Sequence, residues 1–171
     1  NVVFRGEGGM DYTYSGTKGT VLKFSCTGAG SLIDLSEHMG VRWEDIQICY
    51  TSILFTGYYF YMPRSASIPC GSGFSRVMLY SPVGAAYTAL CGWYLKNNVD
   101  VTFDICVPGF ASYGWIGLLN GDTMSETNII RLNNCTTIGL TGAGIANPTT
   151  GWALNSVNFE ASSTGEPCGI I

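Results

Sequence analysis

The chain has 171 residues, a formal net charge of −4, an apolar fraction of 46 % and a charged fraction of only 12 %. This composition excludes a disordered protein, which needs high charge and few aromatic residues. The eight basic residues are spread along the chain without forming a cluster, which excludes a nucleic-acid-binding surface. No apolar run is long enough to span a bilayer, so we expect no membrane insertion.

Cysteine usage points to an exported protein. None of the cysteines forms a Cys-x-x-Cys pair, and the single histidine, His38, cannot complete a zinc site, so we expect neither a metal nor a cofactor. An oxidising compartment explains so many cysteines as disulfides, whereas a reducing one leaves them unexplained. The sequence alone leaves the connectivity open. Cys168, near the C-terminus, is the one expected to remain unpaired; the others are Cys26, Cys49, Cys70, Cys91, Cys106 and Cys135.

Short runs rich in Val, Ile, Thr, Tyr and Phe between turn residues predict β-strands throughout the chain. Residues 99–105 alternate clearly, and this alternation predicts that Asp100, Thr102 and Asp104 face outward. Asn120-Gly121 predicts a two-residue hairpin turn. In chain order the strands are expected at 2–5, 20–26, 45–52, 55–62, 76–80, 100–107, 114–119, 128–132, 136–140 and 156–161.

The domain organisation predicted from these signals is simple. Helical patterns are few, and 23 glycines with regularly spaced turns favour a β sandwich or barrel. We find no internal repeat and no linker. We therefore expect a single receptor-binding β-sandwich domain over residues 1–161, followed by a tail or linker over residues 162–171.

The sequence gives no positive evidence for a catalytic triad or for a pair of catalytic carboxylates. A Ser-His-Asp triad needs His38, and the sequence lacks a Gly-x-Ser-x-Gly elbow; Gly71-Ser72-Gly73 is too common a triplet to count. Asp100 and Asp104 share a face but are typical of a solvated stripe, and the adjacent Glu44 and Asp45 should face opposite sides of a strand. We expect no enzyme. A secreted glycosidase is an alternative that needs two carboxyl groups in one cleft.

Aromatic residues suggest a binding surface instead. Consecutive aromatics at residues 58–61 must occupy both faces of a strand, so some rings should reach the surface, where tyrosine is a rigid amphipathic contact residue. A second aromatic pair follows Cys91 and runs into an amide-rich turn, a combination that suits the apolar face and the hydroxyl groups of a sugar. The predicted carbohydrate-binding residues are Tyr58, Tyr59, Trp93, Tyr94, Asn97 and Asn98.

Several segments occur in the order seen in one lectin family. The start, residues 1–6 followed by Asp11, then Cys26-Thr27-Gly28 with Ile33-Asp34-Leu35, and the final residues 156–160 resemble the GlcNAc-binding lectin domains of chaperone–usher fimbrial tip adhesins, the GafD type. The resemblance implies an immunoglobulin-like or jelly-roll-type β sandwich tied by disulfides. It also implies a Cys26–Cys91 disulfide, which leaves Cys49, Cys70, Cys106 and Cys135 for additional ones.

The resulting hypothesis is a carbohydrate-binding adhesin domain at the tip of a bacterial fimbria, exported through the periplasm to the extracellular space. Its expected partners are a host glycan, on a glycoprotein or glycolipid, and a pilin domain or neighbouring fimbrial subunit. Residues 166–170 are similar to the domain junction of other tip adhesins and support a following domain. The alternatives are a structural subunit of an extracellular filament or capsid, and the secreted glycosidase.

Overall fold

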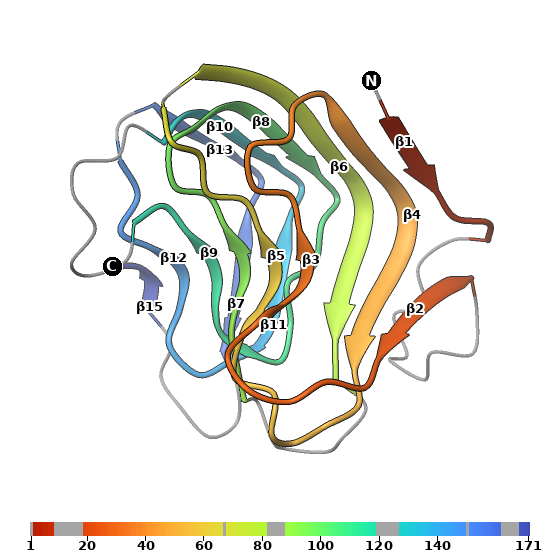
Figure 1. Cartoon of the computed structure of the whole chain (residues 1–171). Coiled ribbons are helices and arrows are strands. Elements are labelled where there is room, and N and C mark those ends of the chain that lie inside the picture. The colour runs from red at the N-terminus through yellow and green to blue at the C-terminus, as the bar shows by residue number, and fades with distance from the viewer. Residues whose placement is uncertain are drawn as a thin grey trace.

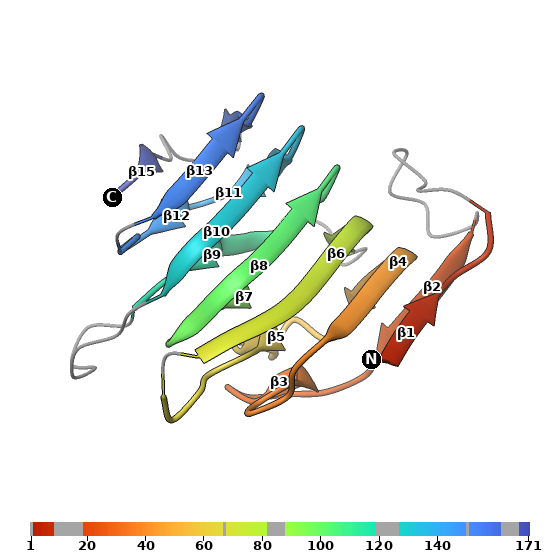
Figure 2. The same cartoon turned by 90° about the horizontal axis from the view of Figure 1, so that it is seen from above.

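The computed structural model describes residues 2–8, 19–66, 68–81, 88–118, 127–149, 151–161 and 168–171. All regular structure within these residues is β-strand, and none of them belongs to a helix. The all-β class predicted from the sequence is therefore confirmed. Two large sheets face each other across the core, and a short third sheet accompanies them (Figure 1; Figure 2).

The strands of the two large sheets alternate along the chain. Sheet 1 consists of β1 (Val2–Arg5), β2 (Thr20–Phe24), β4 (Val41–Tyr50), β6 (Ile68–Tyr80), β8 (Asn98–Asp104), β10 (Asn128–Asn133) and β13 (Trp152–Asn155). Sheet 2 consists of β3 (Ser31–Asp34), β5 (Tyr58–Tyr61), β7 (Ala89–Tyr94), β9 (Ala111–Ile116), β12 (Ala143–Ala146) and β15 (Cys168–Ile170). The third sheet pairs β11 (Thr136–Leu140) with β14 (Asn158–Ala161).

Every strand pair among the described residues is parallel. Each time the chain returns to a sheet, it lies beside the strand that it formed there one coil earlier, as Figure 2 shows for the row β4, β6, β8, β10 and β13. The architecture is thus a parallel β-helix, in which each coil contributes one strand to each large sheet. The hydrogen-bonding groups of one coil are satisfied by the coils above and below it.

In-register stacking fills the core with rows of like residues. In sheet 1, Phe74 and Phe103 are register partners, and their rings stack with centroids 5.0 Å apart. In sheet 2, the Trp93 and Trp115 rings stack at 5.6 Å, and Trp93 reaches across to meet Phe103 edge-on at 5.1 Å. All four side chains are buried. Each such aromatic contact contributes about 0.5–1.5 kcal/mol beyond area burial, so the rows hold successive coils together and the Trp93–Phe103 contact joins the two sheets.

Left-handed backbone positions also stack from coil to coil in sheet 1. They form two rows, and in each of the coils from β4 to β13 four residues separate the position in one row from the position in the other. Such positions bend the chain from one side of the coil to the next without antiparallel pairing. The first row comprises Gly40, Gly71, Asp100, Ile129 and Gly151, and the second Asp45, Arg76, Ile105, Asn134 and Ser156.

The immunoglobulin-like or jelly-roll-type topology is wrong, although the layering of two facing sheets is sandwich-like. Those folds pair their strands antiparallel, whereas the pairs described here are all parallel. The Asn120-Gly121 turn lies outside the described residues. Part of the expected C-terminal tail forms β15, the edge strand of sheet 2.

The disulfides expected from the sequence are not formed between the described cysteines, which are all free thiols. This includes the Cys26–Cys91 pair implied by the family resemblance. Cys106 and Cys135 lie in adjacent coils and share a hydrogen bond; burial raises the pKa of the Cys106 thiol, and this bond lowers the pKa of Cys135. The buried cysteines act as small apolar residues of the core. They are Cys49, Cys70, Cys91, Cys106 and Cys135. The side chain of Cys168 lies outside the description.

Candidate functional site: a polar groove on sheet 1

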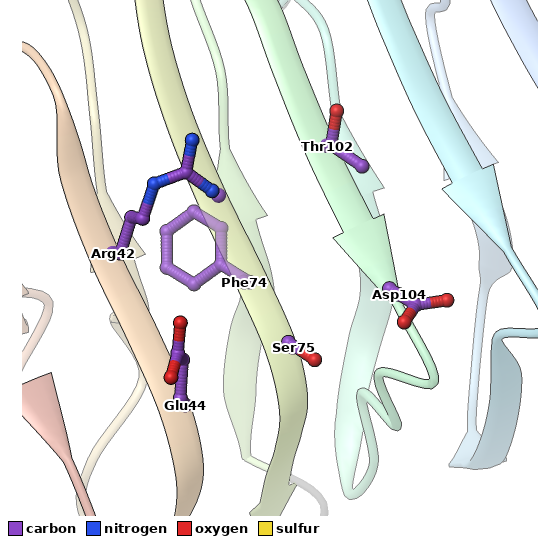
Figure 3. Close-up of a pocket in the computed structure, with 7 residues that line it drawn as sticks. Arg42, Glu44, Phe74, Ser75, Thr102 and Asp104 are labelled. Carbon is purple, nitrogen blue, oxygen red and sulfur yellow. The ribbon is translucent and has the colours of Figure 1, made fainter. Parts of the chain in front are cut away.

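The outer face of sheet 1 carries a groove that follows β6 between its two neighbours. Its main part is a hollow of about 300 Å³. A second hollow of about 160 Å³ continues it toward Gly71 and Asp100 and shares Arg42 and Thr102 with the first. Figure 3 shows Arg42 and Glu44 projecting from β4, Ser75 on β6, and Thr102 and Asp104 on β8.

Register explains why these residues meet. Arg42, Gly73 and Thr102 form one row across the three strands, and Glu44, Ser75 and Asp104 form the next. Alternation along each strand turns these positions outward, while Trp43, Phe74 and Phe103 turn into the core. Residues far apart in the sequence are thus placed side by side by the stacking of three successive coils.

Glycine makes the floor of the groove low. Gly73 has no side chain to fill the space between Arg42 and Thr102, which form the two walls. The Arg42 guanidinium lies over this position, and its Nη1 is 3.1 Å from the place that a Cβ on residue 73 would occupy. Gly73 has an ordinary strand backbone, unlike Gly71, whose φ is +55°. The groove therefore results from the absence of a side chain, and a larger residue at position 73 would fill it.

Charges on this face are balanced and partly paired. Arg5 Nη2 lies 2.5 Å from Glu44 Oε2 on the β4 side. Arg131 Nη1 lies 2.6 Å from Asp100 Oδ1 on the β8 side. Exposed pairs of this kind stabilise the fold little. The face offers both donors and acceptors at fixed positions without a dominant charge.

The residues predicted to bind sugar lie elsewhere, and most of them are buried. Trp93 and Tyr59 are fully buried in the core, and Tyr94 is 2 % exposed. Asn97 and Asn98 are also buried and hold the turn between β7 and β8: Asn97 Nδ2 donates to the Arg64 carbonyl oxygen at 2.8 Å, and Asn98 Nδ2 donates to that of Met62. These five residues support the structure and do not form an open surface.

Tyr58 is the exception among the predicted residues. Its side chain is half-buried, and it lines a hollow on the other large sheet together with Tyr61 and Asp34. The structure therefore does not gather the six predicted residues into one site.

Two features of the sequence belong to the groove. The outward stripe of Asp100, Thr102 and Asp104 was recognised, and the structure confirms its direction, since Val101 and Phe103 are fully buried. The Gly71-Ser72-Gly73 segment is too common a triplet to predict a site by itself, yet it forms the floor beside this stripe. What the sequence could not indicate was that β4 and β8 flank β6.

Other chemistry finds little support in the part of the chain that the structure describes. His38 is exposed, and its Nδ1 lies 2.8 Å from the Ser36 carbonyl oxygen. No cluster of three or more His, Cys, Asp or Glu side chains there could hold a metal ion. Within the same residues, no helix has the length and apolarity needed to cross a membrane.

An apolar hollow of about 440 Å³ lies at the first coils. Phe4, which is 43 % exposed, stacks on Trp43 at its edge with ring centroids 4.4 Å apart. Val2 and Val3 are exposed beside it. Nothing in the structure shows what covers this hollow, so it supports no functional assignment.

Comparisons with known proteins add no family. A scan of protein-family models, a search of curated proteins and a search of solved structures each found no match.

Proposed function

We propose that the protein binds an extended, uncharged oligosaccharide along the groove of sheet 1. The observation that carries this proposal is the groove's construction: a glycine floor on β6 between two rows of polar side chains on β4 and β8. The guanidinium of Arg42 donates hydrogen bonds, the carboxylates of Glu44 and Asp104 accept them, and the Ser75 and Thr102 hydroxyls do both. A polyhydroxylated ligand matches such a set.

The balance of charge favours a neutral glycan over an acidic one. Arg5, Arg42 and Arg131 face the same surface as three carboxylates, so no net positive field is available to attract uronates, sulfates or phosphates. The three carboxylates are Glu44, Asp100 and Asp104. A rigid sheet also keeps the binding groups in place before the ligand arrives, which lowers the entropic cost of binding.

The role suggested by the sequence, adhesion to a host glycan, is compatible with this site. The location at a fimbrial tip, the extracellular compartment and a partner pilin domain remain predictions. The groove supports only the carbohydrate part of that hypothesis, and it does so through residues other than those first expected.

A glycan array followed by calorimetry tests the proposal. We expect binding to neutral oligosaccharides and a loss of at least tenfold in affinity, about 1.4 kcal/mol, for Gly73→Ile, which fills the groove. The matched control is Ala153→Ile, at an exposed outward position on the same sheet outside the groove. Equal affinities for the two variants, or no binding to any glycan by the folded protein, would refute the proposal.

A second candidate function is hydrolysis of the bound glycan. Glu44 and Asp104 lie on the two walls of one groove, in a row with Ser75 between them. Two strand spacings put their backbones about 10 Å apart, near the upper end of the carboxyl separation of inverting glycosidases. Release of reducing ends from a bound oligosaccharide, abolished by both Glu44→Gln and Asp104→Asn, would establish this activity. Its absence leaves binding alone.

A further inference from the structure

A second hollow lies on the other large sheet and does not communicate with the groove. It has a volume of about 230 Å³ and is bounded by residues of β3, β5 and the segment before β3. Its lining combines two tyrosine rings with one carboxylate and one serine hydroxyl. The lining residues are Ala29, Gly30, Ser31, Asp34, Tyr58 and Tyr61.

The aromatic side of this hollow belongs to a cluster of tyrosines outside the main core. Tyr58 and Tyr61 have ring centroids 5.1 Å apart, and Tyr94 packs behind them at 5.6 and 5.4 Å, respectively. Phe60, between them in sequence, packs instead in the main core. Tyr58 and Tyr61 are half-buried, whereas Tyr94 is buried, so the first two are held rigidly and still border the hollow.

The polar side of the hollow is formed by Asp34 at the end of β3. Its Oδ1 accepts hydrogen bonds from the Ser36 backbone N–H, at 2.8 Å, and from the Ser36 hydroxyl. These bonds lower the pKa of Asp34, so the carboxylate is charged at neutral pH. Among the described residues none donates a hydrogen bond to Oδ2, and the residue is exposed. One carboxylate oxygen is thus oriented by Ser36 while the other is available to a ligand.

We propose that this hollow binds the pyranose ring of a neutral sugar, with an apolar ring face against Tyr58 and Tyr61 and hydroxyl groups donating to Asp34. Aromatic rings match the C–H face of a pyranose, and a carboxylate accepts hydrogen bonds from neighbouring hydroxyls. The charge of Asp34 repels the carboxylate of a uronic or sialic acid. The inference is independent of the groove, because the two sites lie on different sheets and share no residue.

Ligand-observed saturation-transfer NMR on the whole chain tests this inference. The probes are the methyl glycosides of glucose, galactose and mannose, with methyl glucuronide as the acidic comparison. We expect transfer to at least one neutral glycoside and none to the glucuronide. Tyr61→Leu, which removes the ring, and Asp34→Asn, which removes the charge, should each weaken binding at least fivefold. Tyr61→Phe, which keeps the ring, should stay within about twofold of the parent.

Two further measurements separate this site from the groove and from misfolding. Gly73→Ile should retain the monosaccharide signal, because it changes only the groove. Asp34→Asn keeps an oxygen that can accept the Ser36 bonds, so its melting temperature should stay close to that of the parent. The inference is overturned if no neutral glycoside gives transfer, if the signal persists undiminished in Tyr61→Leu and Asp34→Asn, or if Gly73→Ile abolishes it.

Discussion

Replacing Ile129 tests the stacked left-handed positions that shape every coil. Ile129 has a φ of +55°, in the row that contains glycine at positions 40, 71 and 151, and it is 41 % exposed. A left-handed backbone costs a residue with a Cβ about 1–2 kcal/mol. Glycine avoids this cost but loses about 0.5–1 kcal/mol through its greater freedom in the unfolded chain. Ile129→Gly should therefore be more stable than Ile129→Ala by about 0.5–1 kcal/mol.

The comparison of two truncated variants removes the contribution of the isoleucine side chain, which both lack. In a chain of this size the difference corresponds to a melting temperature about 1–3 °C higher for Ile129→Gly, measurable by calorimetry. Ala153→Gly is the control, since Ala153 is exposed on the neighbouring strand and has no positive φ. There the sign should reverse, with a loss of about 0.5–1 kcal/mol. A lower stability for Ile129→Gly than for Ile129→Ala would refute the reasoning.

Three further predictions follow from the packing and the charges. The Arg76 guanidinium, paired with Asp45 at 2.5 and 2.8 Å, holds the pKa of that carboxyl below its ordinary range. The pair thus stabilises the fold above pH of about 4 and stops doing so as the pH falls through the lowered pKa. Asp45→Asn should cost on the order of 0.5 kcal/mol at pH 6 and progressively less as the pH is lowered, as read from urea denaturation at each pH. Gly114→Ala should cost about 1–3 kcal/mol in the same assay, because its Cβ would lie 2.6 Å from the Gly144 carbonyl oxygen; a parent-like midpoint contradicts this packing. Mass spectrometry after iodoacetamide treatment without reductant tests the free thiols among the described cysteines. In the native protein only Cys26 should be modified, and after unfolding all six should be. A pair that stays unmodified after unfolding would indicate a disulfide.

The strands of sheet 1 were largely predictable because their two faces differ. Residues 99–105 illustrate this: Val101 and Phe103 are fully buried, while Thr102 and Asp104 line the groove. A period of two in apolarity is sufficient to locate such a strand and to assign its faces. It carries no information on whether the neighbouring strand is parallel or antiparallel, which is why the coiled architecture was missed.

Most strands of sheet 2 were missed for a different reason. Gly92, Gly114, Gly144 and Gly169 lie at corresponding positions of β7, β9, β12 and β15, where glycine is normally unfavourable for a strand. A Cβ at Gly92 or Gly114 would meet the backbone of the next coil at 2.6 Å. The close approach of coils makes glycine necessary there, and this tertiary requirement cannot be inferred from local propensity.

The repeat was hidden by unequal coil lengths. The register partners Phe74, Phe103 and Leu132 recur at even spacing in sheet 1, but Leu154 follows sooner, at the same shorter spacing that separates Trp93 from Trp115 in sheet 2. Insertions between strands change the period without disturbing the stack. The conformation that repeats, a pair of left-handed residues with four residues between them, is occupied by different residue types and leaves no common motif.

The candidate site could be predicted only in part. Aromatic content suggested ligand contact, but composition does not separate rings that fill a core from rings that reach solvent, and Trp93 and Tyr59 fill the core. Tyr58 alone of the predicted residues borders a hollow. The groove combines side chains from three coils, so its existence depends on register between segments that are distant in sequence.

The location of the bound glycan tests the proposed function most directly. Backbone amide shifts should be recorded by NMR while a neutral oligosaccharide, selected from the array, is titrated into the protein. Binding in the groove predicts that the largest shift changes fall on residues 42–44, 71–75 and 100–104, which form its walls and floor. A saturable titration whose changes fall elsewhere and leave these three segments unperturbed would contradict the central claim.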